Sequence, residues 1–281
     1  MSEPVEERIE VRGRDGHAWQ VLAVLPDAPR MRLLWLPAMG VAAKHYLPFA
    51  RALAAHEVAV FIHDWRGIGT SNLRPARNCD WGYRELLVDD LPATEAAIAG
   101  RVVDLPRIVG GHSLGGQLAC CHLAMAPKIA SQLWLVASGS PYWRNFHPRQ
   151  RLWLPMAYRF LPWFAERRGF LPGHSIGFGG NESRGLIRDW ARTGLSGRYA
   201  AHRLDIDLES AMSNVAVEAH AIVLSDDWLA PRRSAEYLLE KLPASRHRFD
   251  SLDTQALGTH AGHFEWMKQP AAVVASLLRP G

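Results

Sequence analysis

The chain has 281 residues, of which 48% are hydrophobic and 21% are charged, and its formal net charge is a mild +4. This length allows one large buried core, and this composition excludes an intrinsically disordered chain. No uninterrupted apolar run approaches the roughly 18 residues that a membrane-spanning helix needs. We therefore expect a globular protein without an integral membrane segment.

The start of the chain and its cysteines indicate a cytoplasmic protein. Residues 1–7 are acidic and contain no apolar segment, so they do not resemble a signal peptide. Cys79, Cys120 and Cys121 cannot all pair, and two of them are adjacent in a predicted buried helix. We expect reduced thiols in a cytoplasm. None of the three has C-x-x-C spacing, which argues against a cysteine metal site.

The first half of the chain alternates short apolar strands with helical patterns. Asp80 is expected to cap the helix that follows it, and Pro92 to bend that helix. The alternation is typical of βαβ units, so it predicts a mostly parallel sheet with helices on both faces. We predict strands over residues 5–11, 18–25, 31–36, 58–62, 105–109 and 133–136, and helices over residues 45–56, 83–99 and 114–126.

The alternation stops after Ser140 and resumes near residue 219. The stretch between is poor in β-branched residues and rich in tryptophan, proline and arginine. We therefore predict an insertion over residues 140–214, between two parts of one core, residues 1–139 and 215–281. In the second core part, we predict strands over residues 219–224 and 245–249 and helices over residues 232–242 and 267–278.

Gly-His-Ser-Leu-Gly, Gly111 to Gly115, lies between a predicted strand and a predicted helix. In that context G-x-S-x-G is typical of a nucleophile elbow, a sharp turn that exposes the serine hydroxyl. A Cβ atom at either glycine would crowd the strand or the start of the helix. Ser113 is therefore the candidate nucleophile, and the alternative is an ordinary βα turn with a capping serine.

A serine nucleophile needs a histidine base and an acid that orients it, here in the chain order Ser, Asp or Glu, His. Asp226 and Asp227 directly follow a predicted strand, and we favour Asp227, four residues before a proline. For the base we favour His263 over His260, because Gly262 frees the backbone beside it. His112 adjoins Ser113 on a sharp turn, so its side chain should point away.

An oxyanion site needs two backbone donors. One is the N–H of Leu114, directly after the nucleophile. The other should come from the loop after the strand over residues 31–36, which reads Pro37-Ala38-Met39-Gly40. We assign it to Met39, and Gly40 allows the loop to approach closely; the plain alternative for these small residues is a turn.

Together these motifs resemble the α/β-hydrolase superfamily, in order and spacing over nearly the whole chain. Asp64 to Ser71 is similar to the family's D-x-R-G-x-G-x-S loop, which is structural more often than catalytic. The insertion resembles the mainly helical cap of many members, and details such as Tyr142-Trp143-Arg144 resemble a bacterial subgroup of uncharacterised hydrolases. One departure is Pro37-Ala38, where many members have His-Gly; a backbone donor survives that change. The resemblance implies acyl transfer to water with no metal or organic cofactor.

The insertion carries eleven arginines, no lysine and three acids between Pro141 and Arg203, and it is also strongly aromatic. We expect most of the aromatic side chains to form the core of the cap, and Pro155 and Pro162 to break it into short pieces. Other interpretations are an apolar pocket under the cap, a rim arginine that binds a carboxylate or phosphate, and a cap that lies on a membrane surface. The basic residues form no recognisable nucleic-acid-binding module.

The main hypothesis is therefore a serine hydrolase that cleaves esters of small or medium apolar acyl groups through Ser113, Asp227 and His263. A thioesterase or acyltransferase would use the same residues. A non-catalytic binding protein on the same scaffold is disfavoured, because it should have lost one of the three. We expect a small-molecule acyl substrate and no nucleic-acid partner, and leave a homodimer open.

Overall fold

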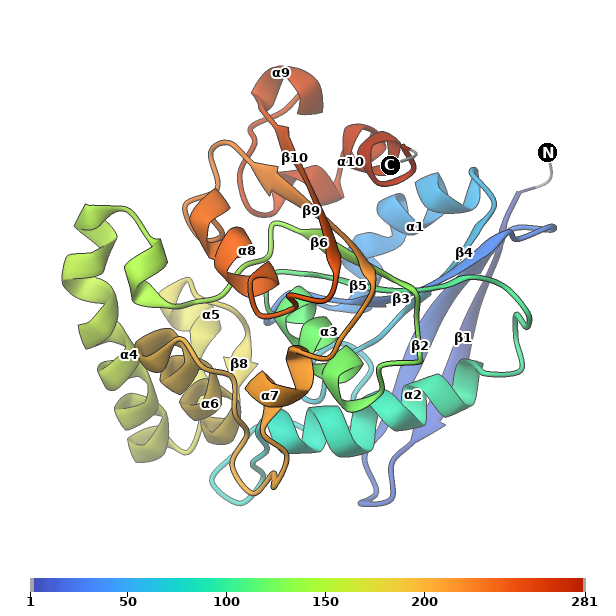
Figure 1. The fold of residues 1–281 in the computed structure, drawn as a ribbon. Helices are drawn as coiled ribbons and strands as arrows, with labels where there is room; N and C mark the ends of the chain where they lie inside the picture. The colour runs from blue at the N-terminus through green and yellow to red at the C-terminus, as the bar shows by residue number, and fades with distance from the viewer. Residues whose placement is uncertain (1–2, 280–281) are drawn as a thin grey trace.

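The computed structural model describes residues 3–279 and contains one large sheet covered by helices on both faces (Figure 1). The order of its strands is β1-β2-β4-β3-β5-β6-β9-β10. Each pair of neighbouring strands from β4 to β10 is parallel, and β1 and β2 add an antiparallel edge, which confirms the predicted mostly parallel sheet. The strands are β1 (Val5–Arg12), β2 (Ala18–Leu25), β3 (Met31–Leu36), β4 (Val58–Ile62), β5 (Arg107–His112), β6 (Gln132–Val136), β9 (Glu218–Leu224) and β10 (Arg246–Leu252).

The central strands are buried on both faces because helices cover both. Every residue of β4 is buried, which explains why its sequence is a continuous apolar run without alternation. Helices α1, α9 and α10 contribute to the apolar core on one face, and α2, α3, α7 and α8 to the core on the other. These helices are α1 (Leu47–Ala54), α2 (Leu91–Ile98), α3 (Leu114–Met125), α7 (Leu208–Met212), α8 (Arg232–Leu239), α9 (Thr254–Leu257) and α10 (Ala271–Leu277).

Two predictions about these helices are wrong. Asp80 does not cap the helix that follows it; its carboxylate accepts a hydrogen bond from the backbone N–H of Gly185 (3.0 Å), more than 100 positions away. That helix begins with a π-helical segment, Glu85–Asp90, which runs directly into α2, whose second residue is Pro92. The closing helix is also not continuous, because Pro270 separates a short 3-10 turn from α10.

The insertion between β6 and β9 forms a mainly helical cap. Its helices are α4 (Pro148–Arg168), α5 (Gly173–Ile176) and α6 (Arg184–Ser196), and two very short strands, β7 (Leu171–Pro172) and β8 (Asn181–Glu182), pair beside them. Figure 1 shows α4 and α6 at the left, away from the β1 edge. The described residues also include three 3-10 segments: η1 (Ala43–Tyr46), η3 (Trp143–Asn145) and η4 (Glu265–Met267).

The prediction that Pro155 and Pro162 break the cap into short pieces is wrong, since both lie inside the 21-residue helix α4. Each proline removes one backbone hydrogen bond from a helix interior. The packing of Leu154 and Tyr158 into a small apolar cluster with Ala191 of α6 offsets that loss. The Tyr158 hydroxyl also donates to the carbonyl oxygen of Pro141 (2.6 Å) and so fastens α4 to the start of the insertion.

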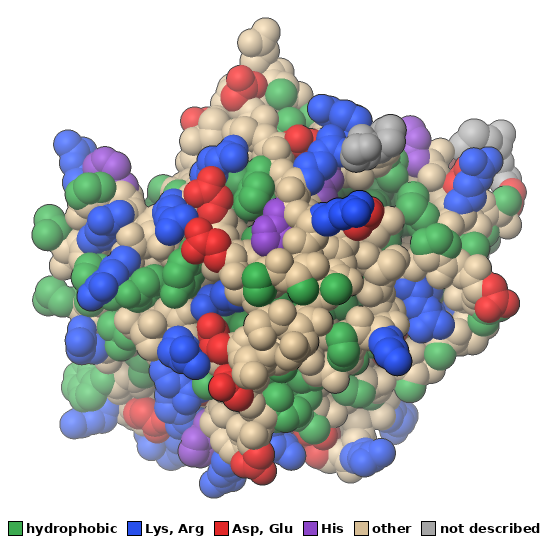
Figure 2. Space-filling model, viewed as in Figure 1, with side chains coloured by type: hydrophobic (Ala, Val, Ile, Leu, Met, Phe, Trp, Pro, Cys, Tyr) green, Lys and Arg blue, Asp and Glu red, His purple; other side chains and the backbone are tan. Residues whose placement is uncertain are grey.

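The arginines of the insertion lie at the surface of the cap. Ten of the eleven are exposed, and Arg184 is half-buried. Figure 2 shows Lys and Arg side chains, in blue, gathered over the part of the molecule where Figure 1 places α4 and α6. No helix in the described part of the chain is long and apolar enough to cross a membrane.

Candidate active site

Ser113 occupies a sharp turn between β5 and α3. Its backbone has φ 54° and ψ −120°, a conformation that non-glycine residues rarely adopt and that often marks a functional site. The flanking glycines make the turn possible: a Cβ on Gly111 would lie 2.3 Å from the carbonyl carbon of Gly115, and one on Gly115 would lie 2.0 Å from the Leu36 carbonyl oxygen. The expected steric reason for both glycines therefore holds.

His263 and Asp227 form a buried hydrogen-bonded pair. Nδ1 of His263 lies 2.7 Å from Oδ2 of Asp227, and both side chains are almost inaccessible to solvent. The other carboxylate oxygen, Oδ1, accepts hydrogen bonds from the backbone N–H groups of Leu229 (2.9 Å) and Ala230 (3.1 Å). The carboxylate is thereby fixed in the turn after β9, with one oxygen left to orient the imidazole.

Their neighbours Asp226 and His260 form a separate pair at the surface. Nδ1 of His260 lies 3.2 Å from Oδ2 of Asp226, and both side chains are exposed. Asp226 also accepts hydrogen bonds from Thr254 Oγ1 (2.9 Å) and from the backbone N–H of Ala261 (3.3 Å), so it ties the start of α9 and the loop after α9 to the turn after β9. This geometry gives the two carboxylates different surroundings, one buried and one solvated.

The proposed oxyanion donors come from two elements that meet beside Ser113. Leu114 is the first residue of α3, and the first N–H groups of a helix have no partner inside it. The loop that carries Met39 is held by two hydrogen bonds: Trp65 Nε1 donates to the Pro37 carbonyl (2.8 Å), and the Ala38 N–H donates to the Tyr46 hydroxyl (2.9 Å). Pro37-Ala38 thus replaces His-Gly in a loop with firm anchors.

Ser113, His263, Met39 and Leu114 all border one cavity of about 410 Å³ under the cap. Asp227 lies behind His263 and does not border it. Most of the wall is apolar and aromatic, and among the described residues no Asp, Glu, Lys or Arg lines it. The cap contributes Phe146, Trp153, Leu154, Tyr158, Phe178 and Trp190.

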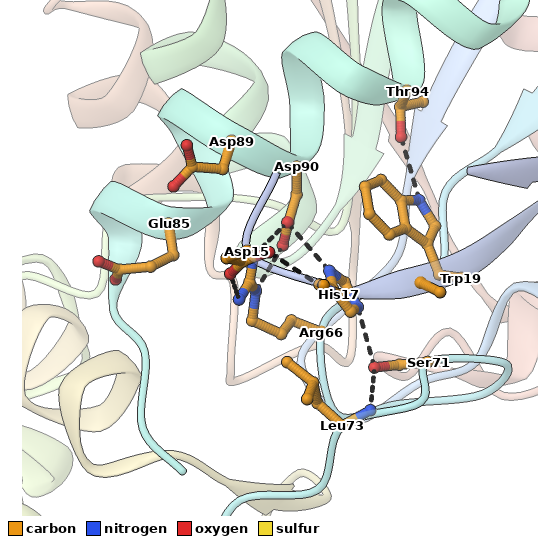
Figure 3. A network of polar contacts seen from close by, with 12 residues as sticks. Asp15, His17, Trp19, Arg66, Ser71, Leu73, Glu85, Asp89, Asp90 and Thr94 are labelled. Carbon is orange, nitrogen blue, oxygen red and sulfur yellow. Dashed lines mark hydrogen bonds and ion pairs between the residues drawn. The ribbon is translucent and has the colours of Figure 1, made fainter. Parts of the chain in front are cut away.

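Arg66 and Ser71 of the D-x-R-G-x-G-x-S loop after β4 belong to a buried polar network (Figure 3). Arg66 donates two hydrogen bonds to Asp90, through Nε (2.9 Å) and Nη2 (2.5 Å), and a third to Asp15 (2.5 Å). His17 lies between Asp90 (3.0 Å) and the Ser71 hydroxyl (3.0 Å). None of these five side chains borders the cavity beside Ser113, so the loop has a structural role.

Sequence reasoning missed two residues next to the site. The Tyr46 hydroxyl contacts both the Ala38 N–H and Nδ1 of His112 (2.8 Å), and the His112 ring lies 4.7 Å from that of His263, centroid to centroid. Glu182 of β8 is buried in the cap and borders a small space that Met39 and Leu114 also line. No local pattern marks either residue, because both depend on contacts between distant segments.

Comparison with known proteins is consistent with this fold. No curated protein sequence matches the chain. Among solved structures, a hydrolase from Pseudomonas aeruginosa PA01 has a TM-score of 0.67 and 16% identity over 97% of each chain. A thermophilic esterase from Thermogutta terrifontis has a TM-score of 0.61 and 16% identity over 97% of this chain and 96% of that one. Identities this low show a common fold alone.

The sequence itself matches a family model. Residues 27–191 match the family described as serine aminopeptidase, S33, a stretch that includes Ser113 and ends before Asp227 and His263. This match covers more than half of the chain and confirms the resemblance to the α/β-hydrolase superfamily. The chain therefore belongs to the serine aminopeptidase S33 family of α/β hydrolases.

Proposed function

We propose that this hydrolase cleaves carboxylic esters of apolar acyl groups, with Ser113 as nucleophile, His263 as base and Asp227 as the orienting acid. One observation carries the proposal: the strained turn at Ser113 and the imidazole of His263, which is paired with the buried Asp227, border a single apolar cavity. A serine hydroxyl is a weak nucleophile unless a base removes its proton, and an orienting acid fixes the tautomer of that base.

In the proposed mechanism, the Ser113 oxygen attacks the ester carbonyl carbon while Nε2 of His263 takes the hydroxyl proton. The N–H groups of Met39 and Leu114 stabilise the resulting oxyanion. The tetrahedral intermediate then collapses, the bond to the alkoxy oxygen breaks, and His263 returns its proton to the departing alcohol. Water, deprotonated by His263, releases the acid from the acyl-enzyme by the same steps, and Ser113 regains its proton.

The wall of the cavity supports an uncharged, apolar acyl group. The family name refers to an aminopeptidase, which must bind a free α-ammonium group, and the described wall holds no carboxylate to pair with one. A coenzyme A thioester would bring phosphates, and no arginine or lysine lines this wall either. A thioesterase domain from the curacin biosynthetic pathway shares the fold, with a TM-score of 0.58 and 15% identity over 96% of this chain and 99% of that one.

Covalent labelling tests the nucleophile. A fluorophosphonate probe should modify wild-type protein at Ser113, and Ser113→Ala should remain unlabelled with an unchanged circular dichroism spectrum. Ser138→Ala is a matched control, because that hydroxyl donates to the Ser113 carbonyl oxygen (2.7 Å) and has no part in the proposed attack. A folded wild-type protein that takes no label would leave only a non-catalytic binding role.

A substrate series tests the acyl group. The cavity predicts that kcat/KM for p-nitrophenyl esters rises from acetate to medium-length acyl chains and then falls as the chain outgrows about 410 Å³. Matched acyl thioesters and aminoacyl p-nitroanilides, measured in parallel, should be poorer substrates. Faster turnover of the anilides would overturn the ester assignment in favour of peptidase activity.

A further inference from the structure

We propose that the exposed face of the cap helix α4 docks on an anionic lipid surface, so that the mouth of the cavity opens toward that surface. The docking rests on the surface of α4 alone. The accompanying substrate assignment, an apolar acyl ester presented at a lipid interface, rests on the proposed function.

An apolar stripe runs along the outside of α4. Leu152, Met156, Phe160 and Trp163 are 81%, 70%, 54% and 51% exposed. Their spacing of four, four and three residues places them within one quarter of the helix circumference, opposite the buried Leu154. The expectation that the aromatic residues form the core of the cap is wrong for this half of the helix. Monomeric proteins rarely expose such a contiguous apolar surface without a partner.

The charge of α4 indicates the kind of partner. The helix carries five arginines and a single glutamate, Glu166, which instead faces Arg184 and Arg188 of α6 (3.6 Å each). Within residues 3–279, none of the five forms an ion pair. Figure 2 shows this mixture of green and blue side chains at the left, where Figure 1 places α4. The five are Arg149, Arg151, Arg159, Arg167 and Arg168.

Arginines beside exposed aromatic and aliphatic side chains suit the interface of an anionic membrane, where the apolar groups enter the acyl boundary and the guanidinium groups contact phosphates. A second copy of this chain fits less well. If two copies met through this stripe, ten arginines would be brought together without acids to pair them.

The mouth of the cavity adjoins the stripe. Trp153, which follows Leu152 on α4, lines the cavity and is also exposed. Its ring lies 6.0 Å from that of Trp228, centroid to centroid, in the turn after Asp227. Trp228 and Phe264, next to His263, are likewise both exposed and part of the wall. A surface that covers the stripe would therefore face the entrance to Ser113.

Vesicle co-sedimentation of the full chain tests the docking. The probes are phosphatidylcholine vesicles and vesicles with about a third phosphatidylglycerol. The stripe variant is Met156→Ser with Phe160→Ser, and the charge variant is Arg149→Gln with Arg159→Gln. The control is Val5→Ser with Val103→Ser, since these valines are each 59% exposed and lie away from the cap, Val5 on the edge strand β1.

Wild type and the control should bind anionic vesicles at least about tenfold better than neutral ones, and less well at high salt. The stripe variant should lose at least about tenfold in partitioning, and the charge variant should lose the preference for anionic lipid. All four should hydrolyse a soluble p-nitrophenyl ester equally, because none of the altered residues lines the cavity.

Wild-type protein that stays in solution with both kinds of vesicle would overturn the docking, and so would a stripe variant that binds like wild type. A wild-type dimer in sedimentation velocity that the stripe variant converts to a monomer would show that a second copy covers the stripe. If vesicles bind as expected but the soluble ester is not cleaved, the docking stands and the proposed function fails.

Discussion

The Tyr46 hydroxyl links the proposed oxyanion loop to His112, whose ring contacts that of His263, the proposed base. The hydroxyl oxygen accepts a hydrogen bond from the Ala38 N–H, so its proton is free to donate to Nδ1 of His112. Burial lowers the pKa of His112 well below its ordinary value, and the nearby His263 lowers it further. His112 therefore stays neutral, so in the proposed mechanism it would add no second positive charge beside His263.

Tyr46→Phe should lower kcat about tenfold with little change in KM, because it leaves the Ala38 N–H without its partner and loosens the loop that carries Met39. The free energy of unfolding should fall by about 1 to 3 kcal/mol. Steady-state kinetics and urea titration measure both effects. Tyr83→Phe is the control, since the buried Tyr83 hydroxyl has no hydrogen-bond partner among the described residues. Wild-type kcat in Tyr46→Phe would show that the loop does not depend on this bridge.

The two adjacent aspartates should respond very differently to the loss of charge. Asp227→Asn should lower kcat by roughly 10⁴, because an amide N–H facing Nδ1 of His263 would stabilise the tautomer that cannot accept the Ser113 proton. Asp226→Asn should leave kcat within about twofold, since that side chain is exposed and pairs with His260. Ester hydrolysis at saturating substrate measures both. Loss of turnover in Asp226→Asn alone would transfer the acid role to that residue.

Local apolar patterns were enough to predict the eight strands of the large sheet, and their alternation with helices was enough to predict that most of these strands are parallel. Local patterns do not predict which polar group a side chain binds when the partner lies in a distant segment. The carboxylate of Asp80, for example, accepts a hydrogen bond from the backbone N–H of Gly185 and does not cap the helix that follows it. Helix α4 contains Pro155 and Pro162 and packs against α6. Helix propensities of single residues do not include such tertiary packing, so they did not predict this helix. The candidate triad was visible as an order of residues, whereas Tyr46 became visible only through its contacts.

The short strand β8 carries a buried carboxyl group, that of Glu182, which forms no ion pair with any residue that the structure describes. Burial raises the pKa of Glu182 to about 7, although a hydrogen bond from the Gly180 N–H (3.0 Å) acts in the opposite direction. Arg66 borders the same small space but is bonded to Asp90 and Asp15. The Gly180 segment in turn packs on Gly40, where an added Cβ would lie 2.0 Å from the Gly180 nitrogen.

Glu182→Gln should remove a pH dependence of stability. A carboxyl group whose pKa is raised on folding stabilises the folded protein most below 4.5, its pKa in the unfolded chain. This stabilisation is lost as the pH rises to about 7, its pKa in the folded protein. Between pH 5 and pH 8, the free energy of unfolding of wild type should therefore fall by about 2 to 3 kcal/mol relative to that of Glu182→Gln. Urea titrations across this range measure the difference.

Glu166→Gln is the matched control for that experiment, because Glu166 also lies in the cap but is half exposed and pairs with Arg184 and Arg188. Its stability difference from wild type should stay constant between pH 5 and pH 8. If the free energies of unfolding of Glu182→Gln and wild type instead changed in parallel between pH 5 and pH 8, the pKa of Glu182 would not be raised on folding, and this carboxyl would be ionised near neutral pH.

At the scale of the whole molecule, the network around Asp90 ties three distant segments together (Figure 3). Asp15 and His17 come from the β1–β2 hairpin, Arg66 and Ser71 from the loop after β4, and Asp90 from the π-helical segment before α2. Burial alone would raise the pKa of Asp90, but hydrogen bonds from His17 and Arg66 lower it below its ordinary value. The carboxylate is thus charged and paired at neutral pH.

Asp90→Asn should reduce the free energy of unfolding by about 3 to 5 kcal/mol at pH 7, because it leaves the buried Arg66 guanidinium with only the half-exposed Asp15. Asp89→Asn is the matched control, because the carboxylate of Asp89 forms a solvent-accessible ion pair with Arg84 (3.5 Å). Its loss should lower the free energy of unfolding by less than about 1 kcal/mol. Urea unfolding measures both.

The pH dependence separates this pair from a packing effect. A carboxyl with a lowered pKa contributes its stability above the unfolded value of 3.8 and loses it as the pH falls below that value. The difference in free energy of unfolding between wild type and Asp90→Asn should therefore become smaller below about pH 4. If the variant had only lost a packing contact, this difference would not change with pH. Fluorophosphonate labelling of Ser113 should be unchanged in Asp90→Asn under native conditions, since the network lies outside the cavity. Slower labelling of a fully folded variant would mean that the network also positions the elbow.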